Sequence, residues 1–229
     1  MAGRRSYDDP CGVARALGVI GERWALLVVR ELLEGPKRFG DLSRGLPGMS
    51  QNVLSQRLRE LEAGGVVRRV RLGPPASANG YELTERGARL EPVLLTLATW
   101  GSRLPLDTGS DAELSVDALV LALRTTFDPA AAGDLRAVCE LRMGDDRFRA
   151  EIGDARFRAT RATAPAPAET TAAPPVPDAV LTAGVGTLRA LVCGGRPLTD
   201  ALRAGDAHLT GDRATAARFL ACFPRPTPA

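Results

Sequence analysis

The chain has 229 residues, of which 45% are hydrophobic and 25% are charged. This balance is typical of a soluble globular protein with one large domain or two small ones. No apolar run approaches the ~20 residues that a membrane-spanning helix needs, and the polar N-terminus lacks the apolar stretch of a secretory signal. The composition therefore argues against a membrane protein and predicts a cytoplasmic one.

The net charge of +3 is unevenly distributed along the chain. Residues 1–104 contain 16 Lys and Arg against 11 Asp and Glu, whereas residues 105–229 contain 14 against 16. A basic first half and a slightly acidic second half predict different partners for the two parts. The excess is too small to identify a DNA-binding protein by charge alone.

The first domain is expected to span residues 1–106 and to be mostly helical. Pro-Gly and Gly-Gly pairs act as helix stops, and Ser50 and Thr84 are suitable N-cap residues. Between these signals the periodicity predicts helices at 10–17, 22–33, 39–46, 50–63 and 84–100, the last kinked at Pro92, and strands at 66–72 and 81–83.

A linker is expected at Leu104 to Ala112, where Pro, Gly, Ser and Asp separate two helical patterns. The second domain, residues 113–229, includes a proline-rich stretch at 162–177 that we interpret as an extended loop. Its pattern predicts helices at 114–127, 187–193, 198–203 and 213–222 and strands at 137–143, 147–152, 156–160, 179–182 and 208–210. The fold class is therefore α+β, a winged helix-turn-helix followed by helices on a curved antiparallel or mixed sheet.

Cysteine and histidine are too sparse and too scattered for a structural metal site. The four cysteines include no C-x-x-C pair, and His208 is the only histidine. The sequence also lacks the G-x-S-x-G, G-x-G-x-x-G and P-loop motifs. We therefore expect no metal, no cofactor and no enzymatic activity.

Residues 50–63 form a helix with two unlike sides. Leu54, Leu58 and Leu61 recur at i, i+4 and i+7 and predict a buried stripe. The other side carries amides, a hydroxyl and a guanidinium in place of the usual Glu and Lys, at Gln51, Asn52, Ser55, Gln56 and Arg59. Asn and Gln bond bidentately to adenine and Arg to guanine in the major groove, so the pattern favours DNA binding over an ordinary solvated face.

The flanking segments support this interpretation. A short helix and a tight turn precede the helix that Ser50 caps, which is the arrangement that lets a second helix enter the major groove. The basic residues nearby are expected to hold phosphates or to reach a minor groove: Lys37 and Arg38 before the short helix, and Arg68, Arg69 and Arg71 in the hairpin arm. Each arginine alone is explained as a solubilising charge, but the assembly predicts a DNA interface.

Several short motifs follow one another along residues 8–104: Cys11, IGERW at 20–24, ELLEGPKRFGDL at 31–42, LSQRLRELE at 54–62, YELTERG at 81–87 and Trp100-Gly101. In this order and spacing they resemble the HxlR-type winged helix-turn-helix regulators. The resemblance implies a homodimer, built through the first and last helices, that binds double-stranded DNA at a two-fold operator. The loop at 73–80 departs from the usual pattern by its Pro-Pro pair and small residues.

Cys11 is open to two interpretations. Some members of the family sense oxidants or electrophiles through a cysteine at this position, and a thiol near a helix start can have a lowered pKa. The alternative, which we favour, is a small residue that packs the dimer helices.

The second half contains VLT at 180–182, LRAL at 188–191, ALRAG at 201–205 and LTGD at 209–212. Over about residues 114–223 these motifs resemble the sterol-carrier-protein-2-like (SCP2) domain. The resemblance implies a shell of sheet and helices around an apolar tunnel for a lipid-like effector, with Leu181, Val185, Leu188 and Leu191 as candidate lining residues. The alternative is a filled core that serves packing or dimerisation.

These observations predict a sequence-specific, DNA-binding transcriptional regulator. It is expected to act as a homodimer on a pseudo-palindromic operator and to respond to an apolar effector in the second domain. The alternative is a lipid-binding or enzymatic protein whose helix-turn-helix mediates only protein contacts.

Overall fold

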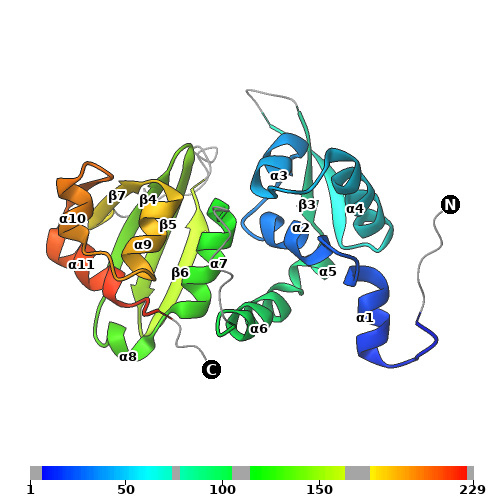
Figure 1. Ribbon diagram of the computed structural model, residues 1–229, viewed down its shortest axis with the longest axis horizontal. Helices are drawn as coiled ribbons and strands as arrows, with labels where there is room; N and C mark the ends of the chain where they lie inside the picture. The colour runs from blue at the N-terminus through cyan, green and yellow to red at the C-terminus, as the bar shows by residue number, and fades with distance from the viewer. Residues whose placement is uncertain (1–6, 74–77, 105–113, 163–175, 226–229) are drawn as a thin grey trace, which may run out of the picture. The chain divides into compact units, whose positions relative to one another are not determined.

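The computed structural model describes residues 7–73, 78–104, 114–162 and 176–225. The chain divides into two compact units, Met1–Leu94 and Leu95–Ala229, which are described separately (Figure 1). The division falls inside helix α6 (Glu91–Gly101). The predicted linker lies almost wholly outside the described residues, so the predicted domain limits of 1–106 and 113–229 stay predictions.

The N-terminal unit combines helices with a small antiparallel sheet of strand order β1-β3-β2. Its core contains fully buried leucines and valines from α2, α3 and α4, together with Val66 and Val67 beside the sheet. In chain order the elements are α1 (Gly12–Ile20), α2 (Ala25–Leu32), β1 (Lys37–Arg38), α3 (Phe39–Gly45), α4 (Gln51–Ala63), β2 (Val67–Leu72), β3 (Ala78–Leu83) and α5 (Glu85–Ala88).

Two predicted helix limits in this unit were wrong. The helix expected at 22–33 begins only at Ala25, because Trp24 has a φ of 78° and cannot continue a right-handed helix. The helix expected at 84–100 is two helices, α5 and α6, separated at Arg89 and Leu90. Pro92 lies in the first turn of α6, where its missing N–H has no intrahelical partner to lose.

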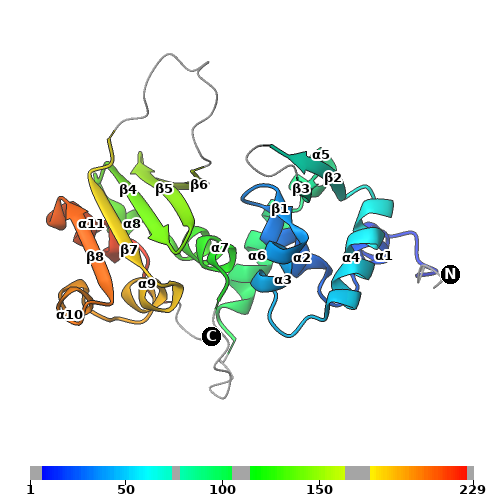
Figure 2. The same cartoon turned by 90° about the horizontal axis from the view of Figure 1, so that it is seen from above.

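The C-terminal unit is built on a five-stranded mixed sheet of order β6-β5-β4-β7-β8 (Figure 2). Strands β4 and β7 are parallel and the other pairs are antiparallel. The elements are α7 (Val116–Thr126), α8 (Pro129–Ala132), β4 (Ala137–Met143), β5 (Asp146–Gly153), β6 (Arg156–Arg161), β7 (Ala179–Ala183), α9 (Val185–Val192), α10 (Leu198–Arg203), β8 (Ala207–Gly211) and α11 (Arg213–Ala221). The α+β class and the mixed sheet are thereby confirmed, and α8 and β1 are additions that the sequence pattern missed.

The pleat of the sheet separates an inner face from an outer face. Along β4 the odd-numbered residues from Ala137 to Met143 are buried, while the even-numbered ones are half-buried. Helices α7, α9 and α11 contribute residues such as Leu123, Leu188 and Phe219 to the same core as these buried strand residues. The outer face therefore carries most of the charged side chains of β4, β5 and β6.

Candidate nucleic-acid interface

Helix α4 is positioned by a tight turn after α3. Gly48 has a φ of 84°, which lets the chain reverse between the two helices, and Leu46 and Met49 anchor the turn in the core. The hydroxyl of Ser50 accepts a hydrogen bond from the backbone N–H of Val53 at 3.3 Å and so caps α4 as predicted. The resulting helix–turn–helix presents α4 as the second helix.

The two sides of α4 differ as the sequence predicted. Leu54, Leu58 and Leu61 are buried. On the other side lie the residues predicted to contact DNA. The exposed ones are Gln51, Asn52 and Arg59, and the half-buried ones are Ser55 and Gln56. Because Asn52, Ser55, Gln56 and Arg59 are spaced at i, i+3, i+4 and i+7, they share one side of the helix.

Internal contacts orient two of these side chains. The Gln56 amide donates to the Glu60 carboxylate, with Nε2–Oε1 at 3.0 Å, and the Arg59 guanidinium donates to the Ser55 carbonyl at 3.3 Å. Both contacts lie within α4 and leave further donors on each side chain. The contacts within α4 therefore orient the Gln56 amide and the Arg59 guanidinium and leave some of their N–H groups free to bond to DNA.

Arginine 57 is an element of this site that the sequence pattern did not reveal. Its side chain is buried in α4 and forms ion pairs with Glu60 and, at 3.5 Å, with Glu22 before α2. A signal was available, since Arg57 falls at i+3 from Leu54 and so on the buried side of the helix. Its ion pairs link α4 to the segment before α2.

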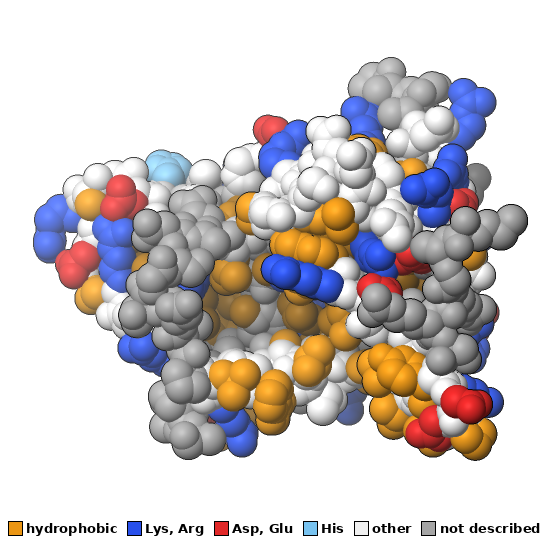
Figure 3. All heavy atoms as spheres, turned by 45° about the vertical axis from the view of Figure 1, so that its right-hand side comes forward, with side chains coloured by type: hydrophobic (Ala, Val, Ile, Leu, Met, Phe, Trp, Pro, Cys, Tyr) orange, Lys and Arg blue, Asp and Glu red, His pale blue; other side chains and the backbone are white. Residues whose placement is uncertain are grey.

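The wing arginines remain on the surface. Arg68 pairs with Glu82 at 2.6 Å, Arg69 approaches Glu62 at 3.4 Å and stacks over Tyr81, and Arg71 is exposed. Their side chains stay accessible, at 66% for Arg68 and 61% for Arg69. Basic side chains gather at the end of the N-terminal unit where β2 and β3 leave the described part of the chain (Figure 3). Residues 74–77 of the wing lie outside that part.

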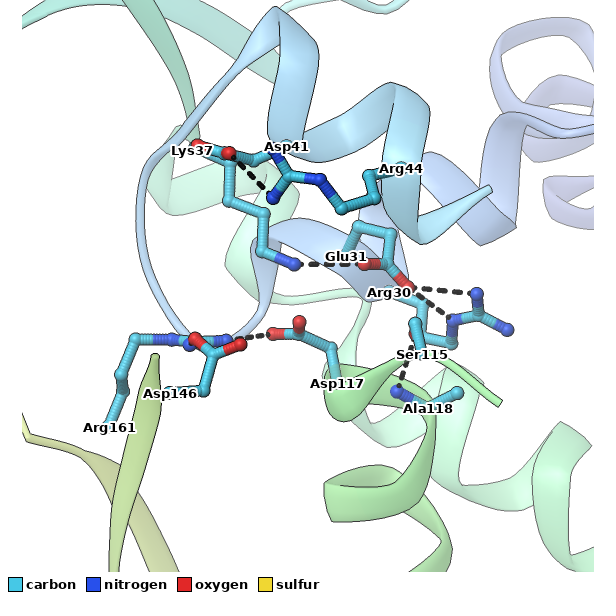
Figure 4. Close-up of polar contacts among 10 residues, drawn as sticks. All are labelled: Arg30, Glu31, Lys37, Asp41, Arg44, Ser115, Asp117, Ala118, Asp146 and Arg161. Carbon is cyan, nitrogen blue, oxygen red and sulfur yellow. Dashed lines mark hydrogen bonds and ion pairs between the residues drawn. The ribbon is translucent and has the colours of Figure 1, made fainter. Parts of the chain in front are cut away.

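Lys37, which was predicted to hold a phosphate, forms an ion pair within the N-terminal unit. Its Nζ lies 2.8 Å from Oε2 of Glu31, a carboxylate with no exposed surface, whose other oxygen is bound by Arg30 at 2.8 Å (Figure 4). Burying an unpaired carboxylate would strongly destabilise the protein, so the ion pair of Lys37 with Glu31 contributes to the stability of the N-terminal unit. Its side chain is only 14% exposed.

Two other cations near α3 are better placed for phosphates. Arg38 is exposed directly before α3. Arg44, which the sequence analysis missed, lies in the last turn of α3, is 80% exposed and contacts Asp41 at 3.3 Å. Basic residues at both ends of a predicted first helix were the signal that could have identified it.

The cysteines differ sharply in exposure. Cys11 is exposed and caps α1, its Sγ accepting from the Ala14 N–H at 3.3 Å. Burial raises the pKa of Cys139 to about 12 and also raises the pKa values of Cys193 and Cys222. The exposed thiol is therefore the one for which a sensing role was considered.

The four residues predicted to line an apolar tunnel have different positions. Leu181, Leu188 and Leu191 are buried core residues, and Val185 packs against the same core. Leu191 lines a cavity of about 360 Å³ formed by α9, the start of α10, α11 and the segment after it. The cavity is lined by Leu191, Val192, Cys193, Gly195, Arg196, Leu198, Ala217, Leu220, Ala221, Phe223, Pro224 and Arg225.

No helix in the described part of the chain is long and apolar enough to cross a membrane. Among the described residues no cluster of His, Cys, Asp or Glu is suited to hold a metal ion.

Comparison with known proteins identifies the N-terminal unit. Residues 19–106 match the family described as HxlR-like helix-turn-helix. The chain is 38% identical over 88 residues to the HTH-type transcriptional regulator YvaP of Bacillus subtilis, covering 38% of this chain and 82% of that protein. It is 40% identical over 108 residues to YtcD of the same species, covering 45% and 86%. A crystal structure of quinone-bound YodB from B. subtilis shares 33% identity over 40% of this chain and 97% of its own, with a TM-score of 0.35. The chain therefore belongs to the HxlR-like helix-turn-helix family of transcriptional regulators.

Proposed function

We propose that this regulator binds operator DNA by inserting α4 into the major groove. The observation that carries the proposal is the side of α4 that presents Asn52, Gln56 and Arg59 away from the leucine core. Amide and guanidinium groups recognise adenine and guanine through paired hydrogen bonds. Gln51 extends this base-reading set, and Ser50 and Ser55 add hydroxyls beside it.

Phosphate contacts are assigned to the arginines around α4. The wing contributes Arg68, Arg69 and Arg71, and the first helix of the motif contributes Arg38 and Arg44. Such contacts position the protein on the duplex and carry no sequence information. Lys37 is left out of this set because it neutralises Glu31.

A homodimer is the proposed active species. Helix α1 exposes Val13 and Leu17, which are 70% and 42% accessible, at i and i+4. Helix α6 exposes Val93, Leu97 and Trp100, which are 48%, 45% and 63% accessible, at i, i+4 and i+7. Large apolar side chains aligned along a helix mark an interaction surface. Two recognition helices related by a two-fold axis would then meet major grooves one turn, ~34 Å, apart.

The base-reading assignment is tested by changing Gln56 and Arg59. Operator sequences are first selected from a random duplex library with the wild-type protein. Gln56→Ala and Arg59→Ala should each weaken binding to the selected site by about 1–3 kcal/mol and relax preference at one base pair. Arg203→Ala, an 80% exposed arginine of α10, is the control. Unchanged base preference in both α4 variants would overturn the assignment.

An apolar effector is the second proposal, and the cavity beside Leu191 supports it. Its lining includes the buried apolar residues Leu191, Leu220 and Phe223 and the exposed Arg225. An effector alters DNA affinity only by binding the DNA-competent and incompetent states unequally, which typically amounts to ~1–3 kcal/mol.

Long-chain fatty acids are the probe for this proposal. They should shift operator binding of the wild type and fail to do so in Ala217→Trp, which fills the cavity from the exposed side of α11. Ala214→Trp, exposed on the same helix and absent from the lining, is the matched control. If fatty acids change neither the wild type nor the control, this domain has a packing or dimerisation role instead.

A further inference from the structure

The outer face of the C-terminal sheet concentrates positive charge in a unit that is not basic overall. Buried and accessible residues alternate along β4, β5 and β6, which identifies the residues of the outer face. Its charged residues are five arginines, Arg142, Arg147, Arg149, Arg156 and Arg158, and two glutamates, Glu140 and Glu151. Residues 105–229 as a whole carry 14 Lys and Arg against 16 Asp and Glu. Charge is therefore segregated by the fold onto this face, which we call the arginine face.

Several described aspartates of the unit form contacts away from the arginine face. The carboxylates of Asp128 and Asp212 cap α8 and α11 by accepting hydrogen bonds from the backbone N–H groups of Ala130 and Ala214. Asp117 and Asp146 bind Arg161 (Figure 4). The Arg161 guanidinium also lies over the Phe148 ring on the inner face. Other aspartates pair with arginines outside this face, Asp134 with Arg218 and Asp154 with Arg136.

Pairing within the arginine face is incomplete. Glu140 binds Arg142 at 2.5 Å and Glu151 binds Arg149 at 2.6 Å. Arg147, Arg156 and Arg158 are exposed and have no ion-pair partner among the residues that the structure describes. Three guanidinium groups are thus available to an external anion.

The register of the sheet places two arginines of the outer face next to each other, which lowers the stability of the strand pair unless an anion binds there. Arg142 and Arg147 lie directly opposite each other on β4 and β5. Like charges at opposed positions destabilise a strand pair, and a bound polyanion removes that repulsion. Arg158 lies opposite Glu151, but the Glu151 carboxylate forms its ion pair with Arg149. The positive charge of Arg158 is therefore available to an external anion as well.

The chemistry of the face matches a phosphate backbone. All its cations are arginines, whose planar guanidinium groups bind phosphate oxygens in a bidentate manner. Thr160 and Thr182 lie opposite Arg149 and Arg142 and add exposed hydroxyl donors. The outer positions of β4, β5 and β6 carry no aromatic side chain for base stacking, which points to backbone contact without base recognition.

We propose that the arginine face binds the phosphate backbone of double-stranded DNA flanking the operator. The inference rests on the proposed function, because α4 brings the duplex to the protein in the first place. It assigns the C-terminal unit a direct, sequence-independent share of DNA affinity. The slightly acidic composition of residues 105–229 alone argues against such a share.

Two duplexes separate this proposal from the proposed function. Both contain the operator selected by the wild-type protein; one ends at the operator and the other continues by about two helical turns, ~20 base pairs, on each side. The full-length chain should bind the longer duplex more tightly and with a steeper salt dependence. Each additional phosphate contact steepens the logarithmic salt slope by about 0.9.

Arg147→Glu/Arg158→Glu is the test variant, since both residues are exposed and unpaired in the described structure. It should keep wild-type affinity for the short duplex and lose the gain from the flanks, with a salt slope smaller by about two. Arg203→Glu/Arg213→Glu changes the net charge equally at exposed sites outside the arginine face and is expected to keep that gain.

The outcomes are distinct. If the wild type binds neither duplex, the proposed function itself fails. If it binds both and the Arg147/Arg158 variant retains the full flank-dependent gain, the arginine face has no role in DNA binding and the proposal is wrong. If the Arg203/Arg213 variant loses the gain equally, the effect is one of net charge and the proposal is also wrong. Thermal unfolding of each variant checks that the sheet is intact.

Discussion

The thiols of the chain occupy environments that predict different reactivities. Cys11 is exposed at the start of α1, whereas Cys139 and Cys222 are buried and Cys193 is half-buried. A raised pKa means less thiolate at neutral pH, and thiolate is the reactive form. The exposure of Cys11, together with the raised pKa values of the other three thiols, therefore predicts that Cys11 reacts first.

Labelling with a chromogenic disulfide reagent at pH 7.5 should show one fast equivalent from Cys11. Cys11→Ser should lose the fast phase and keep the slow ones, and Cys139, with its pKa at about 12, should react only after unfolding. A fast phase that persists in Cys11→Ser would contradict this order. The same pair of proteins tests sensing, since equal DNA binding with and without diamide in both would leave Cys11 a packing role.

At the scale of single elements, α5 depends on a close backbone contact. A Cβ at Gly87 would lie 2.1 Å from the carbonyl oxygen of Val66, and the Gly87 N–H donates to the Thr84 hydroxyl at 3.1 Å. The Thr84 hydroxyl in turn donates to the Gly65 carbonyl at 2.7 Å. Helix α5 is thus fastened to the start of β2 through backbone that has no room for a side chain.

Gly87→Ala should therefore destabilise the N-terminal unit by about 1–3 kcal/mol, the usual cost of overpacking. Gly40→Ala is the matched control, because a Cβ at that position in α3 meets nothing within 4 Å. It should be neutral or stabilising by up to about 1 kcal/mol, since alanine favours a helix over glycine. Urea unfolding measures both, and equal stabilities of the two variants would contradict the contact.

For the whole molecule, the proposed dimer makes the exposed apolar side chains of α1 and α6 a functional surface. Trp100→Glu should shift the protein from dimer to monomer in sedimentation at concentrations where the wild type is dimeric, because a charge would be buried at the interface. Val176→Glu, an 87% exposed apolar residue before β7, should leave the dimer intact. A wild type that sediments as one chain per operator would overturn the dimer.

The sequence by itself determined much of the local structure. Leucine periodicity predicted α4, and the Ser50 cap was found in place. The alternating pattern predicted the three strands β4, β5 and β6, which the short turns at Gly144-Asp145 and Asp154-Ala155 connect. Asp154 and Ala155 both have positive φ, as a two-residue hairpin of type I′ requires. Such features depend on residues within a few positions of one another, so a linear pattern contains them.

Only the tertiary structure decided which charges are available. Lys37 is six positions from Glu31, and nothing in their spacing shows that the carboxylate is fully buried and needs a cation. Leu181 and Leu191 have the same side chain and both belong to the core of the C-terminal unit, yet only Leu191 also lines the cavity beside α11. The arginine face likewise arises from strand register, which brings together residues that the sequence separates. Local periodicity determines which side of an element is buried, but the contacts between elements determine what each side meets.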